Sequence, residues 1–303
     1  MPELPEVEYT ARQLRATVIG TTIRDAEVFW ERTISHPGLA DFLAEISERR
    51  IEGVRRRGKF LLLDLSGDLF LSIHRRMTGN LLLLPAVWKI DTSLRESDPV
   101  AWETKGPLFV GPETDSALHY CRVCFHLVDG RRLLFTDPRK FGRIELWPRS
   151  REQEVFAALG PEPLSEEFTI EHLKEALAGR KSGIKQVLLT QDVVAGVGNI
   201  YADEALFHAG IHPLRRAHTL TLTEIRLLHE GIVTVLKQGI EHGGTSFNDY
   251  RDLWGEAGEN YNHVHVYQRT GEPCVRCGTL IERMVIAQRS AHFCPTCQPT
   301  IAE

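Results

Sequence analysis

The chain lacks the long apolar segments of membrane proteins. No run approaches the ~18 apolar residues that a membrane-spanning helix needs, and the first twenty residues carry charges throughout, unlike a secretion signal. Hydrophobic residues are 42% and charged residues 25% of the 303 positions, as is usual for globular proteins. We therefore expect a cytoplasmic protein without a membrane partner, with two main domains and a small module.

The chain is also poor in cysteine and has no positive net charge. Its six cysteines are not expected to form a disulfide framework without secretion. The net charge of -5 argues mildly against nucleic acid as a partner, but basic residues gather in segments 49–59 and 131–143. Localised basic stripes can bind phosphates, although charge runs are more often plain solvated faces.

Apolar runs in the first half predict strands separated by turns. After Trp147 and Pro148 the apolar spacing becomes helical, and Thr221 with Glu224 forms a capping-box pattern. The predicted strands cover residues 21–30, 60–65, 69–74, 81–84, 118–128 and 133–136, and the predicted helices cover 166–179, 184–191, 200–209 and 222–239. Segment 85–117 contains several prolines and glycines and is interpreted as a long loop or insertion. The fold class is α+β and multidomain, beginning with an antiparallel β-sandwich.

The first residues, MPELPEVE, predict a nucleophile. Removal of the initiator methionine would leave Pro2 as a secondary amine beside the carboxylate of Glu3. A terminal amine titrates near pH ~7.7 to 8.0, and such amines form Schiff bases. Helical spacing from residue 5 to 18 predicts a helix whose positive end favours an ionised Glu6 and a neutral amine. By themselves these residues favour a proline-rich helix entry with surface acids.

Two CxxC pairs predict a structural zinc ribbon, with sixteen residues between the pairs and Gly278 at a turn. The ligands would be Cys274, Cys277, Cys294 and Cys297. Four thiolates leave no open coordination position, so the ion would stabilise the fold. Two disulfides are the alternative, and the absence of a secretion signal disfavours them.

A third pair, Cys121 and Cys124, falls in a predicted strand. Strand residues three positions apart face opposite sides. We therefore expect these thiols to diverge and to be ordinary strand residues.

An ordered set of motifs resembles the formamidopyrimidine-DNA glycosylase family. The motifs are MPELPEVE, RRGKF, HRRMTGN, TDPRKFGR, LGPEPL, GVGNIYADEALFHAGIHP, YQRTGEPC and the terminal CxxC pair. The resemblance covers the chain apart from segment 85–117. It implies a β-sandwich domain (1–148), a helix-two-turn-helix domain (149–265) and a zinc finger (266–303). It also implies a bacterial, monomeric repair enzyme that acts on double-stranded damaged DNA and contains one zinc ion.

The resemblance implies a bifunctional glycosylase and abasic-site lyase for 8-oxoguanine and formamidopyrimidines. Pro2 would attack the sugar and form a Schiff base, with Glu3 as the proton donor. Lys59 and Arg289 would assist β- and δ-elimination, where fixed cations stabilise developing charge. Taken singly, Lys59 and Arg289 would be interpreted as surface charges.

Further family positions imply contacts with DNA. Met77, Arg139 and Phe141 match three residues that fill the gap left by a flipped base. Out of context, Met77 and Phe141 would be interpreted as core residues. Other predicted DNA contacts are His74, Arg180 and Asn199, together with Tyr120 at an aligned but altered position. Asn199 is also interpreted as a helix cap.

The sequence departs from the family pattern at two places. Tyr120 and Arg122 replace a usual His-x-His pair, and HRRM replaces HLGM, which introduces Arg75 and Arg76. These changes could alter DNA grip or lesion choice but leave the chemistry intact. One alternative is an endonuclease VIII-like glycosylase for oxidised pyrimidines. The other is a zinc-dependent damaged-DNA binding protein without catalysis.

Overall fold

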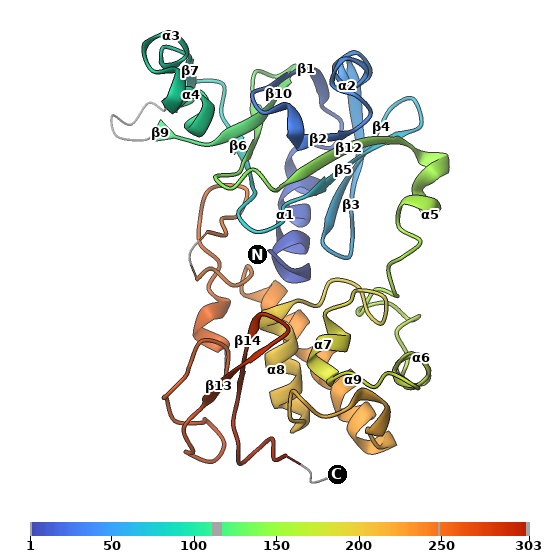
Figure 1. The fold of residues 1–303 in the computed structure, drawn as a ribbon. Helices are drawn as coiled ribbons and strands as arrows, with labels where there is room; N and C mark the ends of the chain where they lie inside the picture. Colours follow the sequence, from blue (N-terminus) through green and yellow to red (C-terminus); the bar gives the residue numbers. More distant parts are fainter. Residues whose placement is uncertain (1, 111–116, 248, 301–303) are drawn as a thin grey trace. The chain divides into compact units, whose positions relative to one another are not determined.

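The computed structural model describes residues 2–110, 117–247 and 249–300. These residues form two compact units (Figure 1). Unit 1 comprises Pro2, Glu6–Val155 and Thr245–Gly258, and unit 2 comprises Glu3–Pro5, Phe156–Gly244 and the described residues from Glu259 onward. Along the sequence, the chain therefore passes through most of unit 2 before it returns to unit 1. The division at residues 148/149 and 265/266 remains our proposal.

Helix α1 (Leu4–Thr17) leads the chain into unit 1. It begins directly after Glu3, as the sequence predicts, and Pro5 occupies its first turn, where a missing N–H costs no hydrogen bond. Its predicted apolar stripe, from Val7 to Leu14, is buried in the unit 1 core. Gly20 follows with φ of +89°, the left-handed conformation that glycine adopts without strain.

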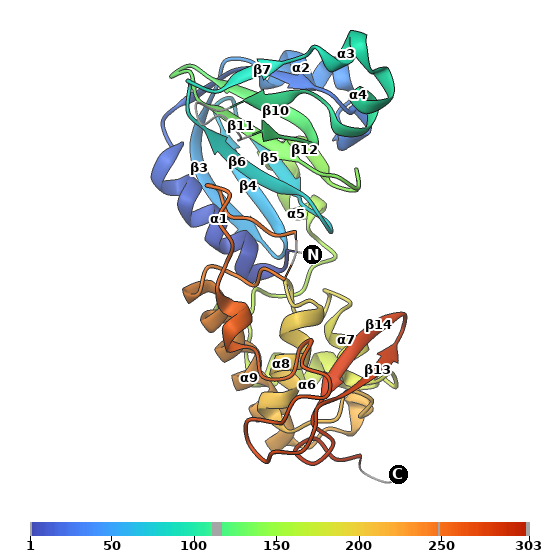
Figure 2. The same cartoon turned by 90° about the vertical axis from the view of Figure 1, so that its left-hand side faces the viewer.

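A continuous sheet forms most of unit 1 (Figure 2). Within the described residues it has nine strands in the order β2-β12-β5-β4-β3-β1-β10-β11-β6. The strands are β1 (Thr22–Val28), β2 (Ile34–His36), β3 (Arg49–Arg57), β4 (Phe60–Leu65), β5 (Leu69–His74), β6 (Asn80–Leu84), β10 (Cys121–Leu127), β11 (Arg132–Thr136) and β12 (Arg143–Pro148). Residues from both halves of this order share one core with α1, as expected of the predicted sandwich. Unit 1 also contains η1 (Glu31–Thr33), α2 (Leu39–Ile46), η2 (Arg149–Arg151) and α5 (Glu152–Val155).

The predicted loop over 85–117 is wrong, because much of this segment is folded. It contains β7 (Lys89–Asp91), α3 (Leu94–Ser97), α4 (Pro99–Lys105) and β8 (Leu108–Val110), and β9 (Ala117–Leu118) follows. Strands β7, β8 and β9 form a small antiparallel sheet. Phe109 belongs to a second apolar cluster with Leu82 and Leu134 from β6 and β11. Burial against the main sheet therefore offsets the cost of ordering this segment.

The expected divergence of Cys121 and Cys124 is also wrong. The β10–β11 register shifts between Cys121 and Val123, so Arg122 is an extra residue in β10. Such a bulge reverses the side-chain alternation on one side of the irregularity. Both thiols consequently lie in the same apolar cluster. Burial raises the pKa of each thiol, which favours the unreactive protonated form.

Unit 2 is mainly helical and ends in a β-hairpin (Figure 2). Its elements are α6 (Ile170–Leu177), α7 (Ile184–Leu188), α8 (Asn199–Ala209), η3 (Ala217–Thr219), α9 (Leu222–Glu241), η4 (Asn260–His263), β13 (Glu282–Ile286) and β14 (Arg289–Phe293). The predicted capping box at Thr221 and Glu224 is confirmed in both directions. No helix within the described residues combines the length and apolarity needed to cross a bilayer.

Candidate functional site

Glu3 lies at the amino end of α8. Its Oε1 accepts a hydrogen bond from Ile200 N at 3.0 Å, and its Oε2 accepts one from Tyr201 N at 3.4 Å. These are two of the amide groups that have no partner within a helix at its start. Glu3 is only 2% exposed. The structure thus supplies the helix cap from a residue almost two hundred positions earlier in the chain.

Gly198, and not Asn199, is the N-cap residue of α8. A Cβ at Gly198 would lie 2.2 Å from Cδ of Glu3, which is closer than atoms can approach. Only glycine therefore permits the carboxylate to reach the helix end. Asn199 is the first helical residue, so its predicted capping role is wrong, although it still lies beside Glu3 at the same helix end.

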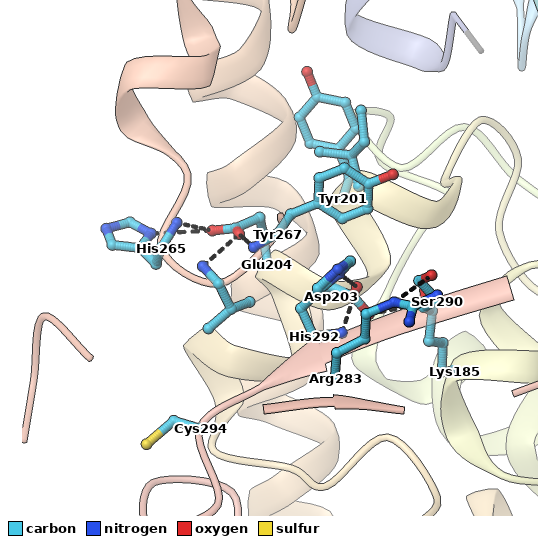
Figure 3. Close-up of polar contacts among 12 residues, drawn as sticks. Lys185, Tyr201, Asp203, Glu204, His265, Tyr267, Arg283, Ser290, His292 and Cys294 are labelled. Carbon is cyan, nitrogen blue, oxygen red and sulfur yellow. Dashed lines mark hydrogen bonds and ion pairs between the residues drawn. The ribbon is translucent and has the colours of Figure 1, made fainter. Parts of the chain in front are cut away.

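Asp203 is buried one turn farther along α8 and binds the zinc-finger hairpin (Figure 3). Its Oδ2 accepts from His292 N at 2.9 Å, and Lys185 Nζ lies 2.6 Å from Oδ1. The same ammonium donates to Ser290 O at 2.6 Å. Burial lowers the pKa of Lys185, whereas Asp203 and the more distant Glu3 raise it. The ion pair thus joins α7, α8 and β14.

Glu204 anchors the segment that leads into the zinc finger (Figure 3). Its carboxylate accepts hydrogen bonds from three consecutive amides, those of His265, Val266 and Tyr267, at 2.7 to 2.9 Å. Three such bonds satisfy a buried charge without a cation. The amino end of α8 therefore binds Glu3 at the chain start, and Asp203 and Glu204 of the same helix bind the zinc finger and the segment that leads into it.

The predicted zinc ligands come together. The Sγ atoms of Cys274, Cys277, Cys294 and Cys297 all lie within 4.8 Å of one another. Sγ–Sγ distances of 3.5, 3.5 and 3.9 Å resemble the roughly 3.8 Å edge of a tetrahedron with zinc–sulfur bonds of about 2.3 Å. They are too long for the about 2.05 Å of a disulfide. The cluster fits a structural zinc ion, which would fix both ends of the β13–β14 segment.

Arg289 is the first residue of β14, and its side chain is exposed. It follows a turn in which Ala287 and Gln288 both have positive φ values, as in the type I′ turns of tight hairpins. The turn, and the hydrogen bond that His292 N donates to Asp203, fix the backbone on either side of Arg289. Arg289, which is predicted to contact a DNA phosphate, therefore extends from a hairpin tip whose backbone is fixed on both sides.

In unit 1, several predicted residues gather at one end of the sheet. Phe60 pairs with His74 in the β4–β5 register, and His74 pairs with Arg143 in the β5–β12 register. Lys59 lies in the turn before Phe60. Burial, and then the charges of Arg76 and Lys59, lower the pKa of His74 to about 3. Its Nδ1 accepts a hydrogen bond from Arg76 N at 3.0 Å, as a neutral imidazole can.

Asp137 joins the two turns that carry the predicted wedge residues. Its Oδ1 accepts hydrogen bonds from Thr78 Oγ1 and from Arg139 N, and its Oδ2 accepts from Gly142 N at 2.7 Å. Asp137 is itself fully buried. The side chains next to these anchors are instead exposed, with values of 42% for Met77 and 47% for Phe141. The interpretation of these two residues as core is thereby excluded.

Arg75 is buried behind the Met77 turn. Its guanidinium donates to Gly79 O, Thr10 Oγ1, Asn80 Oδ1 and Arg251 O. It also lies over the Tyr250 ring, 5.1 Å from the centroid. The unusual HRRM motif therefore places one arginine in the core, where it joins this turn to α1 and to the returning segment Thr245–Gly258.

The remaining predicted DNA contacts, Tyr120 and Arg180, lie apart from these groups in the sequence and next to different elements. Tyr120 has φ of +65° beside the β10 bulge. Arg180 is paired with Asp192, with Nη2 2.5 Å from Oδ2, and precedes α7. The structure brings Glu3 and Asn199 together in unit 2, and Lys59, His74, Met77, Arg139 and Phe141 at one end of unit 1.

Sequence reasoning missed the residues that position these groups. The strongest signal was available for α8, because Asp203 and Glu204 interrupt an otherwise apolar helix. Lys185 likewise lies among buried apolar residues of α7. A charged residue in an apolar helix predicts a buried partner. No comparable pattern identifies the burial of Arg75 or Arg122.

Three family models match the chain in order. The formamidopyrimidine-DNA glycosylase N-terminal domain matches residues 1–144, the H2TH domain of the same enzymes matches residues 159–251, and the zinc finger found in FPG and IleRS matches residues 271–300. With the cysteine cluster, the last match supports one structural zinc ion.

Full-length relatives agree with these matches. A formamidopyrimidine-DNA glycosylase of a Roseiflexus species is 42% identical over 98% of this chain and 100% of its own length. A solved Lactococcus lactis enzyme, a mutant in complex with Fapy-dG DNA, has a TM-score of 0.84 at 33% identity, with 99% and 100% of the two chains covered. The wild-type enzyme with oxidised-pyrimidine DNA gives 0.83 at the same identity and coverage.

Proposed function

The chain belongs to the formamidopyrimidine-DNA glycosylase family, and we propose that it excises oxidised purines from duplex DNA and then cleaves the strand. It is a DNA glycosylase for oxidised bases, and its partner is damaged DNA. The finer proposal concerns the lesions, 8-oxoguanine and formamidopyrimidines, and the chemistry of strand cleavage. We also propose that it acts as a monomer, because one chain carries every residue that this chemistry uses.

The proposed nucleophile is the amine of Pro2 after removal of the initiator methionine. Its lone pair attacks C1′ of the sugar while the bond from C1′ to the damaged base breaks, and the departing base takes a proton from Glu3. The bond from C1′ to the ring oxygen then breaks, which opens the sugar and converts the N,O-acetal at C1′ to an iminium, and the ring oxygen takes up the proton that the amine releases. Glu3 is adjacent to Pro2 in the chain and can carry that proton, because a carboxylate accepts and donates in turn.

The support for Glu3 is its fixed position at a helix end. Hydrogen bonds from Ile200 and Tyr201 hold its oxygens, and its burial excludes bulk water from them. Both hydrogen bonds favour the carboxylate over the acid. We therefore propose that Glu3 begins the reaction ionised, takes the ammonium proton of Pro2 and passes this proton on. The start of the chain would then activate its own nucleophile.

Strand cleavage follows from the acidity of the carbon next to the iminium. Water takes the proton from C2′, and the bond from C3′ to the 3′ phosphate breaks with its electron pair on the phosphate. Loss of the proton at C4′ to water then expels the 5′ phosphate in the same way. Lys59 and Arg289 are the proposed phosphate contacts, and a fixed cation stabilises each leaving group. Arg289 suits this role because its hairpin is anchored to buried Asp203. Bound zinc supplies no step, since four thiolates leave no position for substrate.

Recognition of the lesion is assigned to the two joined turns of unit 1. Met77 and Phe141 have exposed apolar side chains on a buried polar support, which suits insertion into a base stack. The Arg139 guanidinium lies over the Phe141 ring, 4.9 Å from its centroid. We propose that Arg139 hydrogen-bonds the base left without a partner. His74, Tyr120, Arg180 and Asn199 are proposed DNA contacts.

Borohydride trapping tests the proposed nucleophile. Incubation with an 8-oxoguanine duplex and borohydride should give a covalent adduct, and peptide mapping should find it on Pro2. Pro2→Gly should reduce the adduct strongly, because it removes the secondary amine that forms the iminium. Intact mass should show that residue 1 is absent. DNA binding without any adduct would instead support the non-catalytic alternative.

Lesion choice is tested by relative rates. A solved relative was crystallised with oxidised-pyrimidine DNA, so activity on a pyrimidine lesion does not by itself distinguish the alternatives. Single-turnover rates should be compared on matched duplexes with 8-oxoguanine opposite cytosine and with thymine glycol. We expect faster excision of 8-oxoguanine. A preference for thymine glycol would assign the chain to the endonuclease VIII-like alternative.

A further inference from the structure

The insertion helix α4 ends against the turn that carries Arg139 and Phe141. The last carbonyls of a helix have no partner within it, and here each one has a partner. Gly106 N, Lys140 Nζ, Arg122 Nη2 and Tyr120 N donate, respectively, to the carbonyls of Trp102, Glu103, Thr104 and Lys105, at 2.6 to 2.8 Å. Three of these four donors lie outside the helix end itself. Arg122 is in β10, Tyr120 directly precedes β10, and Lys140 lies between β11 and β12.

Arg122 connects α4 directly to the base of the turn. Its Nη2 donates to Thr104 O at 2.7 Å, while its Nε donates to Asp137 O at 2.8 Å. Asp137 is the residue whose carboxylate holds Arg139 N and Gly142 N. The side chain therefore extends from the helix end to the centre of the turn. The side chain is only 1% exposed, and its bond to Asp137 O is buried.

The backbone of Tyr120 makes a second connection parallel to the first. Tyr120 N donates to Lys105 O at 2.6 Å, and Asp137 N donates to Tyr120 O at 2.9 Å. The left-handed φ of +65° at Tyr120 directs both groups in this way. Gly106 is required in this contact, because a Cβ there would lie 2.7 Å from Cys121 O.

Lys140 connects the other side of the Arg139–Phe141 turn to α4. Its Nζ donates to Glu103 O at 2.7 Å and lies 3.8 Å from the centroid of the Trp30 ring. The helix is itself held in place, since the Trp102 ring packs edge-on against Phe29 with centroids 6.0 Å apart. Asp98 caps its other end by accepting from Ala101 N at 2.9 Å. The support is therefore a docked helix and not a loose loop.

We propose that Arg122 is a positioning residue, which uses the end of insertion helix α4 to hold the Arg139–Phe141 turn in the geometry that fills the gap left by a flipped base. This inference rests on the proposed function. It gives a single role to the two features that the sequence predicts to be departures from the family pattern, segment 85–117 and Arg122. The insertion then acts on lesion excision without touching the reacting atoms.

Arg122→Met tests this role, because it keeps the apolar stem and removes both hydrogen bonds. Single-turnover excision of 8-oxoguanine from a duplex should fall at least about tenfold, since small displacements of positioning groups cost this much or more. Borohydride trapping on a single-stranded abasic oligonucleotide, which has no partner base to replace, should stay within about twofold of wild type. A fluorescent base opposite the lesion should show a reduced signal change on binding.

Matched variants separate positioning from stability. Arg24→Met removes an exposed arginine of β1 that pairs with Asp25, and it should leave both reactions unchanged. Arg122→Lys keeps the charge but cannot reach both carbonyls, so it should restore the duplex reaction only in part. If Arg122→Met does not fold, Lys140→Met removes the parallel tie at Glu103 and should produce the same selective loss. Hydrogen exchange of residues 137–142 should be faster in each folded variant.

The outcomes distinguish this inference from the proposed function. Wild-type protein that neither excises nor traps would overturn the proposed function itself. Active wild type, with Arg122→Met or Lys140→Met equally active on duplex DNA and unchanged in the fluorescent signal, would overturn the positioning role. Equal losses on duplex and single-stranded substrates would also overturn it, since they would indicate general damage to the protein.

Discussion

Lys185 and Asp203 form a buried ion pair, with Nζ 2.6 Å from Oδ1, and the same carboxylate holds the backbone of His292. A single interaction thus connects two helices to the strand that begins at Arg289. Breaking a buried pair by removal of one partner leaves a charge without compensation, which costs far more than an exposed pair. Replacement of both charges is a different experiment from replacement of one.

Lys185→Met should destabilise unit 2 by about 3 to 5 kcal/mol. Exposed Lys237→Met should change the free energy of unfolding by less than about 0.5 kcal/mol. The double variant Lys185→Met with Asp203→Asn should recover part of the loss, because the amide can still accept from His292 N and no charge remains buried. Urea unfolding followed by circular dichroism measures all three. A double variant no more stable than Lys185→Met would contradict the ion-pair explanation.

Gly198→Ala should displace Glu3, because the new Cβ would lie 2.2 Å from its Cδ. We expect base excision to slow by about 100-fold, the scale of a displacement of roughly 1 Å in an active site. Gly38→Ala is the matched control, since its Cβ would have no neighbour within 4 Å. Single-turnover excision and DNA affinity should be measured together. A variant that keeps the wild-type rate would show that the Glu3 position is not critical.

Arg75→Met should destabilise unit 1 by about 3 kcal/mol, because it leaves buried acceptors without a donor. Its neighbour provides the control, since Arg76 is exposed and Arg76→Met should cost less than about 0.5 kcal/mol. All five tryptophans lie in unit 1, so their fluorescence during urea unfolding reports this unit. Similar losses for the two arginines would argue against the four hydrogen bonds as the cause.

His74 should make unit 1 less stable in acid. Its pKa in the folded protein is about 3, whereas the unfolded chain takes up the proton near pH ~6.5. Because the unfolded state binds more protons between these values, the stabilisation is complete above about pH 6.5 and falls as the pH decreases toward 3. His74→Gln should reduce the slope of unfolding free energy against pH by at most about 1.4 kcal/mol per unit.

The measurement is tryptophan-detected urea unfolding from pH 5 to 8. His119→Gln provides the control, because His119 is an exposed residue of the same unit. Equal slopes for wild type and His74→Gln would rule out a lowered pKa of His74 in the folded protein.

Loss of zinc should act on Arg289 through the hairpin. Cys277→Ser should abolish zinc retention, loosen β13 and β14 in hydrogen exchange and weaken DNA binding, because metal binding and folding of such modules are coupled. Cys124→Ala removes a buried thiol of unit 1 and should retain zinc. Metal content and affinity are measured on the same samples. Unchanged affinity in verified zinc-free protein would show that the hairpin does not depend on the ion.

Local patterns predicted much of the fold. The strands β4 and β5 were predicted with their observed bounds, because Ser66, Gly67 and Asp68 separate two apolar runs. Strand β3 was missed, since five of the nine residues in Arg49–Arg57 are arginine and their alternation is weak. Folding of segment 85–117 was missed because Phe109 packs on β6, which directly precedes the segment, and on β11, which follows it in the chain. The pattern within the segment does not show these contacts.

The candidate site was predictable only where chemistry requires particular residue types. Four cysteines at ribbon spacing predict their own cluster, and it is present. The support beneath the proposed site was not predictable in this way. Arg122 is the extra residue at a register shift in β10, and neither composition nor periodicity locates such a bulge. Its hydrogen-bond partners are backbone carbonyls. Because every residue has one, no pattern of side chains in the sequence predicts these contacts.

Segment Thr245–Gly258 completes unit 1, although it is encoded after most of unit 2. Leu253 lies in the unit 1 core, and Leu83 N donates to its carbonyl at 2.9 Å. A gene fragment that ends near codon 155 would therefore encode a sheet with part of its interior missing. Recombination could not exchange either unit as one uninterrupted stretch of DNA. The two must be inherited together, and changes in one constrain which changes the other can accept.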